Sequence, residues 1–156
     1  MKAATLGKLK KELDTLLPED VIGVCMKMAK YKKENKELLS YLLFESTYEP
    51  EYITTIKNDI DQQFSEINMS NLYYAKKSIR KILRTTNKYI RYSGLKRTEV
   101  ELRIYFCKKL KESGIPIRTS TTLSNLFNAQ MLKINKAVSM LHEDLQYDYQ
   151  QLIMQI

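Results

Sequence analysis

Glycine and proline are scarce in this chain, with four and three residues among 156. A many-stranded β fold needs these residues at its frequent turns, so their scarcity argues against such a fold. Leucine, lysine, glutamate, isoleucine and methionine are plentiful, and they favour helices. Because apolar residues also recur at steps of three and four along the chain, we predict an all-α fold.

Long apolar runs are also absent. No run of 18 apolar residues is available for a membrane-spanning helix, and residues 1–14 are too charged to form the apolar core of a signal peptide. Apolar residues nevertheless make up 44% of the chain, which excludes a disordered protein. We therefore expect a soluble, cytoplasmic protein with a single all-helical domain over residues 1–156.

Cysteine and histidine are rare, and this limits the chemistry that the chain can perform. Cys25 and Cys107 each lie in an apolar helical pattern, with no second Cys or His at metal-ligand spacing, so we expect two reduced thiols in the core. His142 is the only histidine, and we expect it on the surface of the last helix. No Gly-rich phosphate loop or nucleophile-elbow motif occurs. We therefore expect no metal site, no cofactor and no catalytic residues, and an enzyme is the least favoured class.

The apolar spacing predicts about seven helices in consecutive antiparallel pairs. Their expected positions are about 5–17, 18–30, 35–48, 49–67, 70–93, 98–113 and 123–156. The third is apolar on almost all sides, so we place it at the centre of the fold. The last would span about 50 Å if unbroken, more than the width of a compact bundle, so it could bend or project towards a partner or a second copy.

Two architectures fit this pattern. One is a compact helical bundle, and the other is a short HEAT-like α–α superhelix. A weak internal echo favours the second: Pro18-Glu19-Asp20-Val21-Ile22 resembles Pro50-Glu51-Tyr52-Ile53 at an offset of 32 residues, which is typical of helical-hairpin repeats. The echo does not recur later in the chain.

Several positions have specific predicted roles. We expect Asn35 and Ser70 to cap helices, and Thr98 with Glu101 to form a capping box. Gly94 should end the helix before it. The helix that begins at Pro18 should bury one set of apolar residues, and the helix after Ser70 should bury another. These are Val21, Ile22, Cys25, Met28 and Ala29 in the first, and Leu72, Ala75, Ile79, Ile82, Leu83, Thr86, Tyr89 and Ile90 in the second.

Acidic residues are absent from 67–98, although this stretch contains nine Lys or Arg residues. The whole chain has 26 basic and 18 acidic residues, so the remainder is nearly neutral. On a helix the apolar and basic residues separate onto opposite sides. We name the basic side the cationic face: Lys76, Lys77, Arg80, Lys81, Arg84, Lys88 and Arg91. Lys96 and Arg97 extend it, and Tyr73, Tyr74 and Tyr92 lie within or beside it.

Clustered cations without competing carboxylates are what phosphate binding requires. We therefore predict a non-enzymatic binding module that contacts polyanions, above all the phosphates of DNA or RNA, without strong sequence specificity. The tyrosines would stack on bases or pack against the next helix.

Two alternatives stay open. The helix over 49–66 has five acidic residues and one lysine, so it could fold across the cationic face and neutralise it. The protein could instead be a helical scaffold that binds a protein partner, which a large exposed apolar patch would favour.

Overall fold

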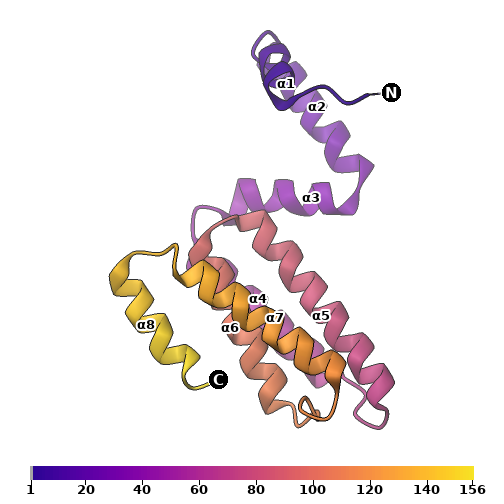
Figure 1. Ribbon diagram of the computed structural model, residues 1–156. Helices are drawn as coiled ribbons and strands as arrows, with labels where there is room; N and C mark the ends of the chain where they lie inside the picture. The colour runs from indigo at the N-terminus through magenta and orange to yellow at the C-terminus, as the bar shows by residue number, and fades with distance from the viewer. Residues whose placement is uncertain (1) are drawn as a thin grey trace. The chain divides into compact units, whose positions relative to one another are not determined.

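The structure is a computed structural model, and it describes residues 2–156 (Figure 1). Within these residues all regular structure is helical, so the predicted all-α fold is confirmed. The helices form two compact units, one ending at Phe44 and one comprising Glu45–Ile156. The single domain expected over 1–156 stays a prediction. Among the described helices, none combines the length and the apolar character needed to cross a membrane.

The first unit contains α1 (Leu6–Leu13), α2 (Pro18–Tyr31) and α3 (Lys33–Ser40), and a π-helical turn, η1 (Tyr41–Glu45), leads into the second. Pro18 opens α2 as predicted, because its missing N–H is not needed there. Asn35 does not cap α3. It lies inside that helix, and its side-chain amide donates to the carbonyl of Met28 (2.9 Å).

No residue of α1, α2 or α3 is buried. The predictions of a core face on the second helix and a central position for the third are therefore wrong. Cys25, expected in the core, is exposed. Two of these helices have only eight residues, and helices of two turns are too short to enclose an apolar core.

The second unit contains five helices: α4 (Glu49–Ser65), α5 (Leu72–Ser93), α6 (Lys96–Glu112), α7 (Thr121–Val138) and α8 (Glu143–Ile153). α6 packs against α4, α5 and α7, which makes it the central helix of this unit (Figure 1). Its buried residues include Cys107, which was expected in the core, and burial raises the pKa of this thiol to about 12. Side chains from four helices fill the core, including Ile60, Ile79, Leu102, Phe106, Leu110, Leu123 and Ile134.

α5 matches its prediction closely. Of the eight residues expected to be buried, Ala75, Ile79, Ile82, Thr86 and Ile90 are buried, Leu83 and Tyr89 are half-buried, and Leu72 is exposed. Gly94 ends the helix at a φ of 68°. This left-handed conformation favours glycine because it has no Cβ. Two caps differ from prediction. Asn71 rather than Ser70 accepts the hydrogen bond at the start of α5, and α6 begins at Lys96, so Thr98 is already inside it.

The last predicted helix is two helices. α7 ends at Val138, and His142 caps α8 by accepting a hydrogen bond at Nδ1 from the N–H of Asp144 (3.4 Å). Acidic residues in the first turn of α8 favour a new helix start. The hydroxyl of Tyr149 then donates to Glu101 on α6 (2.9 Å), so α8 does not project. Apolar spacing missed the break because the four-residue connection preserves the step from Val138 to Leu141.

Ile82 tests the way α5 packs, because its side chain is only 2% exposed. We expect Ile82→Ala to lower the free energy of unfolding by about 2–5 kcal/mol, as large-to-small core substitutions do. Urea denaturation followed by circular dichroism measures the loss. Lys81→Ala, at the exposed neighbouring position, should change it by less than about 0.5 kcal/mol. Equal effects of the two substitutions would mean that α5 packs through a different side.

Candidate nucleic-acid interface

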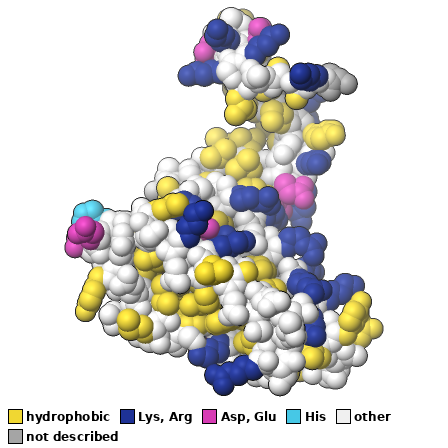
Figure 2. Space-filling view, in the orientation of Figure 1, with side chains coloured by type: hydrophobic (Ala, Val, Ile, Leu, Met, Phe, Trp, Pro, Cys, Tyr) yellow, Lys and Arg dark blue, Asp and Glu magenta, His cyan; other side chains and the backbone are white. Residues whose placement is uncertain are grey.

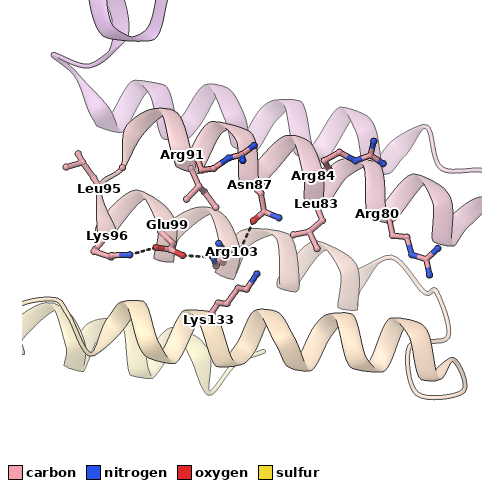
Figure 3. Close-up of a pocket in the computed structure, with 12 residues that line it drawn as sticks. Arg80, Leu83, Arg84, Asn87, Arg91, Leu95, Lys96, Glu99, Arg103 and Lys133 are labelled. Atoms are coloured by element: carbon pink, nitrogen blue, oxygen red, sulfur yellow. Dashed lines mark hydrogen bonds and ion pairs between the residues drawn. The ribbon is translucent and has the colours of Figure 1, made fainter. Parts of the chain in front are cut away.

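A groove of about 730 Å³ lies between α5 and α7, both of which pack against α6 (Figure 3). Residues of all three helices and of the turn after α5 line it. The charged lining consists of six basic side chains and one carboxylate: Arg80, Arg84, Arg91, Lys96, Arg103, Lys133 and Glu99. Its potential is therefore positive, and the groove suits an anionic ligand.

Arg103 lies at the floor of this groove and is only 7% exposed. Its Nε donates to Oε1 of Glu99 (3.0 Å). Its Nη1 donates to Oδ1 of Asn87 on α5 (2.8 Å) and to Oε1 of Gln130 on α7 (2.7 Å). A buried guanidinium needs such partners, and these partners fix its plane between the three helices.

Glu99 is the single carboxylate of the groove, and it is neutralised. Its Oε2 lies 2.8 Å from Nζ of Lys96, and its Oε1 accepts from Arg103. Burial alone raises the pKa of Glu99, but the hydrogen bonds and positive charges of Lys96 and Arg103 outweigh burial, so the pKa lies below the ordinary value of a glutamate. The carboxylate therefore stays ionised and offsets one positive charge, and the six basic side chains of the lining still leave the groove with excess positive charge.

The carboxylates of α4 do not neutralise the arginines of the cationic face. Asp61 pairs with Lys109 on α6 (2.9 Å) and accepts from the hydroxyl of Tyr105 (2.7 Å). Glu49 accepts hydrogen bonds from the hydroxyls of Ser93 and Thr98. Within residues 2–156, no ion pair joins a carboxylate of α4 to Arg80, Arg84 or Arg91. For these arginines, the neutralisation by α4 considered from the sequence does not occur.

The structure brings some of the predicted site residues together and separates others. Arg80, Arg84, Arg91 and Lys96 line the groove. Lys77 and Lys81 are exposed on α5 outside it, whereas Lys76 and Lys88 are half-buried. Nζ of Lys88 lies 4.9 Å from the ring centre of Tyr89 and 6.0 Å from that of Tyr92. In Figure 2, Lys and Arg side chains follow the exposed side of α5.

Arg97 and the tyrosines lie away from the groove. Arg97 lines a second, smaller pocket together with Glu49, Lys57 and Glu101, so carboxylates surround it. Tyr73 and Tyr74 are exposed at the start of α5, with their ring centres 5.4 Å apart. Tyr92 is at the other end of α5 and packs edge-on against Tyr89. Arg97 therefore lies close to carboxylates, and the rings of Tyr73 and Tyr74 are more exposed than that of Tyr92, which is half-buried.

Four polar groove residues were missed from the sequence: Asn87, Glu99, Arg103 and Lys133. Arg103 had a usable signal, because it stands three residues after Val100 and four before Cys107, on the buried side of α6. An arginine that shares the buried side of a helix with apolar residues needs hydrogen-bond partners there, so its position indicates a polar site inside the fold. Lys133 is one of several exposed lysines and has no comparable signal.

Comparison with protein-family models, curated proteins and solved structures found no match to this chain. In residues 2–156, no group of three or more His, Cys, Asp or Glu side chains is placed to hold a metal ion.

Glu99 links the groove to the stability of the fold. Since its pKa is lowered in the folded protein, its stabilising contribution is present above the ordinary glutamate pKa and is lost as the pH falls through the folded value. We expect Glu99→Gln to lower the free energy of unfolding by about 1–3 kcal/mol at pH 7, because Arg103 loses a charged partner. Between about pH 5 and about pH 3 the wild type should then lose more stability than the variant.

Urea denaturation across this pH range measures both effects. Glu112→Gln, which removes an exposed carboxylate from the same helix, is the matched control and should change the free energy of unfolding by less than about 0.5 kcal/mol. Parallel pH profiles for the wild type and Glu99→Gln would contradict the role assigned to this carboxylate.

Proposed function

We propose that the chain is a non-enzymatic, cytoplasmic binding module that contacts the phosphates of DNA or RNA through the cationic face of α5. The observation that supports this most is the state of Arg80, Arg84 and Arg91. All three are exposed, and in the described chain none forms an ion pair with a carboxylate. Guanidinium groups in this state exchange counterions for phosphates, which is the main source of nucleic-acid affinity.

Binding of this kind reads the phosphate backbone rather than the bases. Contacts to phosphates position a protein on nucleic acid but carry no sequence information, and α5 shows no pattern of base-reading side chains. The proposal therefore predicts similar affinities for unrelated sequences and a steep dependence on salt.

Reversing three charges on α5 tests the proposal. We expect Arg80, Arg84 and Arg91→Glu to weaken binding of labelled DNA or RNA by more than about a hundredfold in fluorescence anisotropy. For the wild type, about six phosphate contacts would give a log–log salt slope near −5 on duplex DNA and near −4 on a single strand. The melting temperature should change little, because exposed charges contribute little to stability.

A matched control separates the cationic face from total charge. Lys8, Lys10 and Lys11 are exposed on α1, so their replacement by Glu changes the net charge by the same amount at another place. This control should weaken binding only several-fold. If both triple variants lose the same affinity, or if the wild type binds neither DNA nor RNA at low salt, the proposal is wrong.

A helical scaffold that binds a protein partner is the second candidate function. The observation in its favour is the apolar surface of the first unit, where Leu43 and Phe44 are 61% and 76% exposed. These two residues line a groove with Met26 and Leu39. Exposed apolar patches are typical of protein interaction sites. Self-association through the C-terminal residues stays a prediction, although α8 does not project as that prediction assumed.

A further inference from the structure

We propose that the groove between α5 and α7 binds a single strand of nucleic acid, with one phosphate of the strand on Nη2 of Arg103. This inference rests on the proposed function. It adds the kind of nucleic acid and an anchoring side chain that does not belong to the cationic face.

Arg103 is a donor held in place before any ligand arrives. Three of its five N–H groups are used within the protein, by Glu99, Asn87 and Gln130. Nη2 makes no hydrogen bond within residues 2–156, and it is open to the groove that Arg103 lines. Two N–H groups therefore remain for an oxyanion, and little side-chain entropy is lost when they bind it.

The surroundings of Arg103 add charge around this donor. Arg84 and Arg91 line the groove from α5, and Lys133 points from α7 towards Arg103 and Asn87 (Figure 3). Because Glu99 is already paired twice, a phosphate at this point meets cations from three helices and no free carboxylate. Without nearby cations, Arg103 would only hold the three helices together. Lys133 on the opposite wall adds a second positive charge beside it, and the two together form a site for an anion.

The depth of Arg103 favours a single strand over a duplex. At 7% exposure it lies at the floor between two helices. The phosphates of a duplex follow the outside of a stiff rod, which rests on the edges of such a groove. A single strand is flexible, so its backbone can enter the cationic groove, reach Arg103 at the floor and follow the groove.

The direction of the groove gives the bases a place to stack. Its lining follows α5 from Gly94 back to Arg80. Tyr73 lies seven residues beyond Arg80, about 10 Å further along the helix, and its ring and that of Tyr74 are exposed. A strand that leaves the groove past Arg80 therefore reaches two aromatic rings, the usual partners of unpaired bases.

Two lysines of α7 provide the sharpest test. Lys133 and Lys136 are both exposed on this helix, but only Lys133 lines the groove. With a labelled oligodeoxythymidine of roughly 12 nucleotides, we expect Lys133→Gln to weaken binding about tenfold and to reduce the salt slope by about 0.7. Lys136→Gln should change the affinity less than about twofold. Equal effects of the two substitutions would overturn the assignment of the strand to the groove.

Arg103→Lys tests the anchor. It keeps the charge but loses the fixed guanidinium, so we expect about a tenfold loss of affinity for the oligonucleotide, with the melting temperature measured in parallel. Unchanged affinity would exclude Arg103 as the anchor. If Arg103→Lys does not fold, the comparison of Lys133→Gln with Lys136→Gln still tests the groove. Neither of these substitutions changes a hydrogen-bond partner of Arg103.

Competition distinguishes the two kinds of nucleic acid. An unlabelled single strand should displace the labelled oligonucleotide at a concentration at least about tenfold lower than a duplex of equal length. Equal competition by the duplex would exclude selection of a single strand. The triple Glu variant of Arg80, Arg84 and Arg91 could lose binding while Lys133→Gln and Lys136→Gln both bind like the wild type. In that case the proposed function is supported and the assignment of the strand to the groove is wrong.

Discussion

The buried guanidinium of Arg103 is the interaction on which the arrangement of the second unit depends. A charge removed from water must be paired and hydrogen-bonded, and the partners of Arg103 come from three helices: Asn87 on α5, Glu99 on α6 and Gln130 on α7. The hydrogen bonds fix α5 and α7 on α6, and they also set the floor of the groove. Phe106 and Leu102 of the same helix are completely buried and pack in the apolar core of the unit.

The positions of the carboxylates explain why Arg80, Arg84 and Arg91 form no ion pairs within residues 2–156. The carboxylates that could have neutralised them bind elsewhere: Asp61 binds Lys109, and Glu101 binds Lys57 (2.6 Å) and Tyr149. In both ion pairs a carboxylate and an amine join α4 to α6 rather than α4 to the exposed side of α5. The apolar stripe of α5 turns its basic side to the solvent, so the excess charge of the chain collects along one helix.

The sequence predicted the helical class, the buried face of α5 and its end at Gly94, because amphipathic spacing and a left-handed glycine are local signals. It failed where burial depends on the rest of the fold, as at Phe44, whose apolar neighbours resemble a core helix. It also missed the break before His142, since apolar spacing continued across it. The part of the groove on α7 could not be predicted: Arg84 is visible in the sequence as part of a cationic face, whereas only tertiary packing brings Lys133 opposite it.

Chemical-shift mapping tests most directly whether nucleic acid binds to the cationic face and the groove of the second unit. In a titration of isotope-labelled full-length protein with a short oligonucleotide at low salt, we expect backbone amide shifts to concentrate between Arg80 and Lys96 and around Arg103 and Lys133. The amides of α1 and α8 should move little. Shifts concentrated in the first unit, or spread evenly over all exposed lysines, would mean that nucleic acid does not bind at the cationic face and the groove.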